Sequence, residues 1–250
     1  MCKFELNKIY VSQKGVYEKY IKRLIDILLS SISIILLSWL ILLVALLVRI
    51  KLGSPVIFKQ ARPGIIDTNT YQETIFFMYK FRTMTNEKDD SGNLLPDSER
   101  MTKFGTWLRE TSLDELPELF NILNGSMSII GPRPQLVRDM VFMSDEQRKR
   151  HTVKPGLSGL AQVNGRNAIS WEKKINLDLE YIQNISLLND IKIVYQTFLK
   201  AIFKREGITS ENSVTAEDLG DYLLRVNKID EEQYKLKQII AESILEGKRK

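Results

Sequence analysis

The sequence predicts an α+β fold that is mostly helical, with an N-terminal re-entrant membrane helix and a small cytoplasmic domain that carries amphipathic interfacial helices. Three observations support this prediction: residues 27–48 contain no charged side chain, helical periodicity recurs after residue 115, and only two short runs are rich in β-branched and aromatic residues. Hydrophobic residues make up 44% of the 250 positions, which is enough to build a folded core.

Composition narrows the chemistry that the chain can use. Its one cysteine, Cys2, excludes an intrachain disulfide, and its one histidine, His151, excludes a zinc site built from several imidazoles. The formal net charge of +5 is too small and too dispersed to indicate nucleic acid, whereas anionic lipid headgroups and phosphate substrates both fit it. We therefore expect a reducing compartment, no nucleic-acid partner, and chemistry based on carboxylate, lysine and arginine side chains.

The uncharged run at residues 27–48 predicts a membrane segment that is retained in the mature protein. As a helix it extends roughly 33 Å, which matches a hydrocarbon core of about 30 Å. It is longer than the apolar part of a cleavable signal peptide, and Arg49 follows it in place of small residues. A buried core helix is the alternative, but the only polar side chains of the run are serines: Ser30, Ser31, Ser33 and Ser38.

Basic residues flank this segment on both sides: Lys19, Lys22 and Arg23 before it, and Arg49, Lys51, Lys59 and Arg62 after it. Because cytoplasmic flanks carry the basic excess, both ends are expected in the cytoplasm, so that the helix enters the bilayer and returns. Ser38, near the midpoint, can bend the helix by bonding to a carbonyl one turn earlier. A spanning helix with the N-terminus outside remains the alternative.

The rest of the chain divides into a main domain, residues 53–206, and an extension, residues 207–250, after the membrane-anchoring residues 1–52. The main domain begins with two predicted strands, residues 55–60 and 74–84, separated by a polar turn with Pro63 and Gly64. A surface loop at residues 86–97 then leads to a short helix ending at Arg109. Further helices are predicted at residues 115–124 (closed by Gly125), 135–149, 170–184 and 187–204. A polar linker at residues 207–212 precedes two charged amphipathic helices, near residues 215–227 and 230–246.

The acid pair Asp114 and Glu115 is the feature with the clearest chemical meaning. Proline is tolerated only in the first turn of a helix, so Pro117 places the pair at or near a helix N-terminus. There the helix dipole and free amides keep a carboxylate ionised, which suits a nucleophile or a magnesium ligand. A structural role is the alternative, because Ser112 and Glu115 have the spacing of a capping box.

Basic residues in five separate segments lie next to turn signals and can supply phosphate-binding donors: Lys80, Arg82, Arg109, Arg133 and Arg166. Each of them alone is typical of a solvated surface charge. Two glycine-containing loops, residues 154–159 and 162–167, let backbone approach a ligand, but neither is a Walker or a Rossmann loop. His151 lies in a basic stretch and is expected to be exposed or to cap a helix.

An ordered series of motifs makes the sequence similar to a known family: Lys22-Arg23-Leu24-Ile25-Asp26, Phe58-Lys59-Gln60 with Arg62-Pro63-Gly64, Tyr79-Lys80-Phe81-Arg82-Thr83-Met84, Ser112-Leu113-Asp114-Glu115-Leu116-Pro117, and the runs at residues 121–134 and 159–166. Over residues 15–206 the chain resembles the bacterial sugar transferases. More narrowly, it resembles the small monotopic phosphoglycosyl transferases.

This resemblance implies a catalytic domain on the cytoplasmic face of the bacterial inner membrane and a magnesium-dependent reaction in two steps. Asp114, as nucleophile and metal ligand, would attack the sugar-linked phosphorus of a UDP-sugar and expel UMP. Undecaprenyl phosphate would then accept the phosphosugar, in the first membrane step of glycoconjugate synthesis, and Glu115 would support the metal or activate this acceptor. Phosphate oxygens would be held by Arg109 and Arg133, with help from Lys80 and Arg166. Similarity to small members favours an N-acetylated amino sugar.

The chain departs from the family pattern at three positions and at its C-terminus. Trp39 follows Ser38 where the family usually has proline, so a bend must depend on other interactions. Ser126 replaces a common aspartate, and Leu160 replaces a frequent tryptophan. Residues 207–250 exceed the family core, and their helices are candidates for forming a homodimer or for binding another partner.

A different class of function is compatible with the same residues. In a membrane-anchored scaffold, Asp114 and Glu115 would cap helices while the arginines bind anionic lipid. That interpretation predicts that Asp114→Asn lowers stability by roughly 1 kcal/mol without any catalytic effect.

Overall fold

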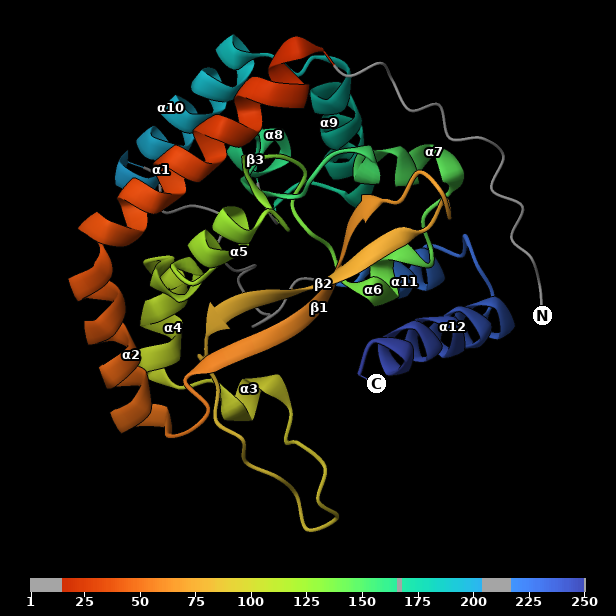
Figure 1. Ribbon diagram of the computed structural model, residues 1–250. Coiled ribbons are helices and arrows are strands. Elements are labelled where there is room, and N and C mark those ends of the chain that lie inside the picture. The colour runs from red at the N-terminus through yellow and green to blue at the C-terminus, as the bar shows by residue number, and fades with distance from the viewer. Residues whose placement is uncertain (1–14, 166–167, 204–216, 250) are drawn as a thin grey trace.

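The described helices and strands confirm the mostly helical α+β prediction. The computed structural model describes residues 15–165, 168–203 and 217–249, and the sheets in these ranges have two strands each (Figure 1). The polar linker predicted at residues 207–212 lies outside the described residues.

The N-terminal apolar segment forms two helices. A π-helical turn, η1 (Tyr17–Ile21), leads into α1 (Lys22–Leu36), and α2 (Ser38–Leu52) follows after a bend of 65°. Among the described residues no single helix is long and apolar enough to cross a bilayer, whereas this bent pair together has the necessary length and composition. At the bend, Ser38 Oγ donates to the carbonyl of Ile35 at 2.8 Å. The predicted bend at Ser38 is therefore confirmed, with Trp39 in place of proline.

Polar side chains at the start of α1 attach it to the main domain. Asp26 is buried, and its Oδ1 accepts hydrogen bonds from the Ile129 amide at 2.9 Å and the Ser128 hydroxyl at 3.1 Å. Arg23 donates to the carbonyls of residues 122 and 123 at 2.6 and 2.7 Å. Because a buried carboxylate without partners is strongly destabilising, these bonds fix both the position and the rotation of α1.

The other side of the bent pair is apolar and exposed. α2 packs on the main domain through Val44 and Val48, which join a core cluster with Phe81 and Leu108. Large apolar side chains on the outer side have no such cover: Leu28, Ile35, Leu36, Trp39, Leu42, Leu46 and Ile50. A contiguous apolar surface of this kind is costly in water and typical of contact with a membrane or a protein partner.

The two predicted strands form an antiparallel hairpin, with one correction. β1 (Ile57–Ile66) pairs with β2 (Glu73–Phe81), and the turn lies at residues 67–72, where Asp67 accepts from two backbone amides. The predicted turn at Pro63 and Gly64 is wrong, since both lie inside β1. The pairing is irregular just after Pro63, which tolerates a residue without an N–H.

The chain between the hairpin and the second sheet follows the prediction closely. α3 (Asp97–Arg100) and α4 (Lys103–Glu110) come after the polar loop and contain the expected helix to Arg109. A short 3-10 turn, η2 (Leu113–Glu115), precedes α5 (Glu118–Asn124), and Gly125 ends α5 in the left-handed conformation as expected. A parallel pair, β3 (Ser128–Ile130) and β4 (Gly156–Ser158), was not predicted because strands of three residues carry almost no periodic signal.

The predicted continuous helix at residues 135–149 is wrong. Three short segments replace it: α6 (Val137–Met140), α7 (Asp145–Arg148) and the 3-10 turn η3 (Lys149–Thr152). Ser144 starts α7 by accepting the amide of Gln147, and such a cap ends the preceding helix. The predicted helices at residues 170–184 and 187–204 are confirmed as α9 (Trp171–Gln183) and α10 (Leu187–Phe203), preceded by a short α8 (Leu160–Val163).

The C-terminal extension contains the two predicted helices, α11 (Leu219–Arg225) and α12 (Glu231–Arg249). They pack on the main domain, where Ala241 joins a core cluster with Val137 and Met140. In Figure 1, α1, α2 and α10 lie along one side of the molecule, the β1–β2 hairpin crosses its middle, and α6, α11 and α12 group on the other side.

Candidate active site

The acid pair lies in the tight connection between α4 and α5. Ser112 has a positive φ of 55° and its side chain makes no capping hydrogen bond, so the capping-box alternative is not formed. Asp114 and Glu115 occupy the 3-10 turn η2, and Pro117 precedes the first residue of α5 with helical dihedrals. The prediction that Pro117 places both acids at a helix start is confirmed.

One lysine of the hairpin links three carboxylates. Lys80, near the end of β2, lies with its Nζ 2.8 Å from Glu115, 3.1 Å from Glu118 and 3.9 Å from Asp114. Arg133 donates to the same Glu115 oxygen at 3.0 Å from the loop after β3. Four of the predicted site residues thus come from three separate segments and meet at one place.

Arg109 and Arg166 complete the set of site residues that the resemblance assigns, and Arg82, the remaining basic candidate, donates to the carbonyl of Ser54 at 2.9 Å. Arg109 donates from α4 to Thr83 Oγ1 at 3.1 Å. Burial lowers the pKa of Arg109, and the nearby Asp114 carboxylate partly offsets this lowering. Arg166 lies outside the described residues, so its role stays a prediction.

Burial and the cations act differently on the two acids. Burial raises the pKa of Asp114, with Lys80 opposing this rise. Burial also favours the neutral form of Glu115, but Lys80 and Arg133 outweigh it and hold the pKa of Glu115 well below its usual range. The sequence predicts that the helix N-terminus keeps Asp114 ionised; in the structure this residue is only 7% exposed, so burial acts against that effect.

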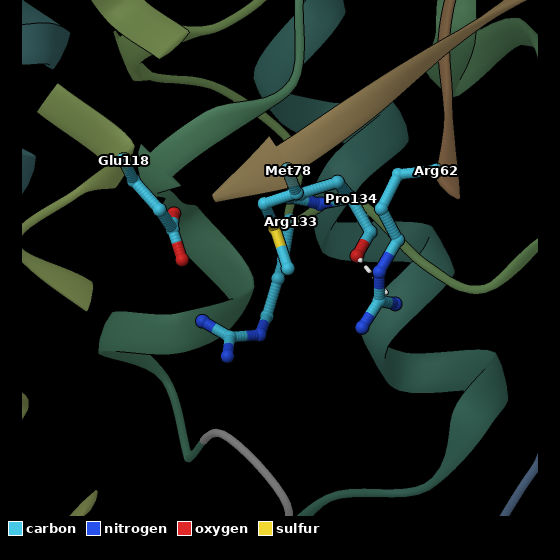
Figure 2. Close-up of a pocket in the computed structure, with 5 residues that line it drawn as sticks. All are labelled: Arg62, Met78, Glu118, Arg133 and Pro134. Carbon is cyan, nitrogen blue, oxygen red and sulfur yellow. Dashed lines mark hydrogen bonds between the residues drawn. The ribbon is translucent and has the colours of Figure 1, made fainter. Parts of the chain in front are cut away.

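Glu118 is a member of the site that sequence reasoning missed. Its side chain is buried, and burial together with the neighbouring Glu115 raises its pKa to about 7, against the opposing effect of Lys80. It lines a small pocket with Arg62, Met78, Arg133 and Pro134 (Figure 2). In Figure 2 the guanidinium group of Arg133 lies between the Glu118 carboxylate and Arg62. The sequence feature that could have indicated Glu118 is its position one helical turn after the acid pair.

The wall of this pocket is held by a second arginine. Arg62 of β1 donates to the carbonyl of Pro134 at 3.1 Å and to Gln60 Oε1 at 2.6 Å. Burial, reinforced by the nearby Arg133, lowers the pKa of Arg62 to about 10, so the guanidinium stays charged at neutral pH. Two positive groups therefore border a pocket that begins at the carboxylate cluster.

His151 is not exposed and does not cap a helix, which corrects the expectation from sequence. It is buried, with Nδ1 3.0 Å from Glu73 Oε1, and burial lowers its pKa. Its neighbour Arg150 pairs with buried Asp178 and also donates to the carbonyl of Arg133 at 2.6 Å. The basic stretch thus supports the loop that carries Arg133.

The donor set limits how a metal can be held. Among the described residues no group of three or more His, Cys, Asp or Glu side chains is arranged to coordinate an ion. Mg²⁺ is commonly held by one or two carboxylates together with substrate phosphates, and a buried carboxylate beside other acids fits that pattern. Asp114 is the acid that fits best, since Glu115 is bonded to Lys80 and Arg133.

The fold and the site have the features of an enzyme that handles phosphate groups next to an apolar surface. Buried acids, three nearby cations and a bordering pocket lie at the junction of the hairpin, α5 and the loop after β3. The sequence profile described as bacterial sugar transferase matches residues 17–204. The chain belongs to the bacterial sugar transferase family, as its motifs indicated.

Three relatives illustrate this membership. The uncharacterized sugar transferase EpsL of Bacillus subtilis is 48% identical over 79% of this chain and 94% of its own length. The UDP-glucose:undecaprenyl-phosphate glucose-1-phosphate transferases of Klebsiella pneumoniae and Escherichia coli are 40% and 37% identical, over 74% and 79% of this chain. The matches cover 41% and 43% of those two proteins, so this chain corresponds to less than half of their length.

The raised pKa of Glu118 predicts a pH-dependent stability difference for Glu118→Gln. In the folded chain the Glu118 carboxyl has a pKa of about 7, whereas its ordinary pKa is 4.5. Wild-type stability should therefore fall as pH rises from about 4.5 to about 7, and the glutamine variant should lack this fall. The free energy of unfolding of the variant minus that of wild type should increase across this window and level off above it.

Denaturant unfolding of both proteins in detergent measures this difference. Glu110→Gln, at an exposed position of α4, is the matched control and should show no trend. A difference that stays constant between pH values of about 4.5 and 7 would show that Glu118 ionises normally.

Proposed function

We propose that this chain transfers a sugar 1-phosphate from a UDP-sugar to undecaprenyl phosphate, through a covalent intermediate on Asp114. The observation that carries the proposal is the position of Asp114: buried, next to Glu115, and facing Lys80 in a member of the bacterial sugar transferase family. The names of the Klebsiella and Escherichia relatives support the same reaction class.

In the first step an Asp114 carboxylate oxygen bonds to the sugar-linked phosphorus. The bond from that phosphorus to the bridging oxygen breaks, and UMP leaves with the electron pair. A carboxylate that is largely removed from water is poorly solvated, which favours this attack. Glu115 is already ionised by its two cations, and it keeps Lys80 and Arg133 oriented toward the reacting phosphate.

In the second step a phosphate oxygen of undecaprenyl phosphate attacks the same phosphorus and releases the Asp114 carboxylate. Because phosphoryl transfer depends mainly on positioning and charge neutralisation, the cations carry much of the catalysis. We assign phosphate oxygens to Arg133 and Arg109, with Lys80 and Arg166 as helpers. Mg²⁺ bound by Asp114 and the substrate phosphates would neutralise charge on the diphosphate.

The bent helix pair supports a re-entrant attachment to the cytoplasmic face of the inner membrane. The Lys22 ammonium at the start of α1 donates to the Asp190 carboxylate in the first turn of α10, so the N-terminal ends of these two helices are joined. α10 also exposes apolar side chains, which extend the apolar surface of α1 and α2: Leu187, Leu188, Ile191, Val194, Tyr195 and Phe198. Such a helix suits the membrane interface, where a lipid-linked acceptor is presented.

The sugar and the pathway are separate parts of the proposal. Glucose 1-phosphate is named for two relatives, and similarity to small family members favours an N-acetylated amino sugar, so both sugars belong in a substrate panel. The product would be a polyprenyl-diphosphate sugar, which serves as the first membrane intermediate of a capsule, O-antigen, exopolysaccharide or glycoprotein glycan.

We also propose that two copies of the chain form a homodimer through the C-terminal helices. α12 packs with one side on the main domain, and its other side exposes Leu236 and Ile239. If these residues form a contact between copies, Leu236→Glu should convert a dimer into a monomer in analytical ultracentrifugation. A monomeric wild-type chain would contradict it.

Release of UMP from a panel of UDP-sugars, with undecaprenyl phosphate and Mg²⁺, tests the reaction. Asp114→Asn should abolish UMP release while the chain stays folded, because the amide is not a nucleophile. Glu110→Gln is the control and should keep full activity. Full activity of Asp114→Asn would reject the nucleophile, and a loss of about 1 kcal/mol in stability with no catalytic effect would favour the scaffold interpretation.

The single cysteine of the chain tests the topology directly. Cys2 precedes the bent pair, so a re-entrant arrangement leaves it on the same side of the membrane as the main domain. A membrane-impermeant thiol reagent should label Cys2 in inside-out vesicles and leave it unlabelled in right-side-out vesicles. Ser91→Cys in a Cys2→Ser background, at an exposed loop position, marks the side of the main domain. Opposite labelling of the two cysteines would establish a spanning helix.

A further inference from the structure

The C-terminal extension lies outside the family match, which ends at residue 204, and it contacts the part of the main domain that follows the active-site loop. α11 and α12 both pack against α6, which begins four residues after Arg133. Figure 1 shows these three helices grouped together beside the hairpin. The extension is therefore in a position to act on Arg133 through α6.

Asp139 joins the extension to α6 with both of its carboxylate oxygens. Oδ2 accepts the Leu136 amide at 3.0 Å, and Oδ1 accepts the Leu219 amide at 2.8 Å. Leu136 precedes α6, and Leu219 is the first residue of α11. Asp139 is only 2% exposed. Only a carboxylate can accept from both amides, because an asparagine presents an NH₂ group to one of them.

Close packing reinforces this joint. Gly220, the second residue of α11, lies so near Phe142 that a Cβ atom would come within 2.6 Å of the phenyl ring. Lys237 of α12 donates to the carbonyl of Val141 at 2.5 Å, and Ala241 is buried against Val137. The extension thus contacts α6 and the two residues after it, between residues 137 and 142.

The loop before α6 is fixed from its other side by the main domain. Arg150 donates to the carbonyl of Arg133, and Arg62 donates to the carbonyl of Pro134. The amide of Gly156 donates to the carbonyl of Pro132 at 3.0 Å. Residues 132–134 are therefore held by three donors of the main domain, and the following residues are held by the extension through Asp139.

We propose that the extension is a clamp on the Arg133 loop, with Asp139 as the positioning residue that sets how Arg133 meets the substrate phosphates. The proposal rests on the proposed function, because it assigns a phosphate-binding role to Arg133. The extension then raises the affinity of the active site without contributing a side chain to it.

Asp139→Asn is the direct test, because it removes one acceptor of the joint. Gly220→Ala disturbs the packing of α11 on Phe142 while the charge of Asp139 stays unchanged. Both variants should raise the Kd of UDP, a probe that is independent of the sugar, by about tenfold. They should also raise KM for the UDP-sugar more than they lower kcat. Asp221→Asn is the matched control on α11, since Asp221 is exposed and accepts one hydrogen bond from Tyr234, and it should leave both constants unchanged.

A double-mutant cycle with Arg133→Ala identifies the route of the effect. If Asp139 acts through Arg133, Asp139→Asn should weaken UDP binding by less than about twofold in the Arg133→Ala background. An equal, roughly tenfold loss in both backgrounds would contradict positioning and leave Asp139 with a general structural role.

Hydrogen exchange supplies a readout that does not depend on activity. The amides of peptides covering residues 132–140 and 217–225 should lose protection in Asp139→Asn. Unchanged exchange would overturn the clamp, and faster exchange with unchanged UDP affinity would overturn its effect on Arg133. A wild-type chain that neither binds UDP nor releases UMP would reject the proposed function itself.

Discussion

One partly buried ammonium group, that of Lys80, faces three carboxylates, and the arrangement of the active site depends on this imbalance of charge. Removing Asp114, Glu115 and Glu118 from water is costly, and one lysine cannot neutralise all three. Arg133 supplies a second positive charge by donating to Glu115. Glu118 avoids ionisation at lower pH because its pKa is raised to about 7. Burial raises the pKa of Asp114, the acid that the family resemblance assigns as nucleophile, and Lys80 opposes this rise.

One short helix connects this cluster to the apolar helix pair. The N-terminus of α5 follows the acid pair, and its last carbonyls accept the hydrogen bonds of Arg23 at the start of α1. Asp26, one turn further along α1, holds β3, whose end leads into the Arg133 loop. The attachment of the apolar pair and the geometry of the acids and arginine are therefore set by the same few contacts.

Local rules predicted the parts of this structure that short-range physics determines. Pro117 located the acid pair at a helix start, Gly125 ended α5, and the Ser38 hydroxyl marked the bend in the apolar segment. Tertiary contacts decided the rest. Pro63 and Gly64 resemble a turn but lie in a strand, because β1 needs a small residue beside Thr74. His151 and Glu118 look like surface residues in the sequence, and only the folded chain shows the partners that bury them. The role of Asp139 was likewise hidden, since Leu219 is far away in the sequence.

The covalent intermediate on Asp114 is the central claim, and its formation without the lipid acceptor tests it most directly. The chain is incubated with Mg²⁺ and its UDP-sugar in the absence of undecaprenyl phosphate, and UMP release and peptide masses are followed together. We expect a burst of about one UMP per chain and a sugar-phosphate adduct on the peptide that contains Asp114. UMP release that strictly requires undecaprenyl phosphate, with no adduct on that peptide, would contradict it.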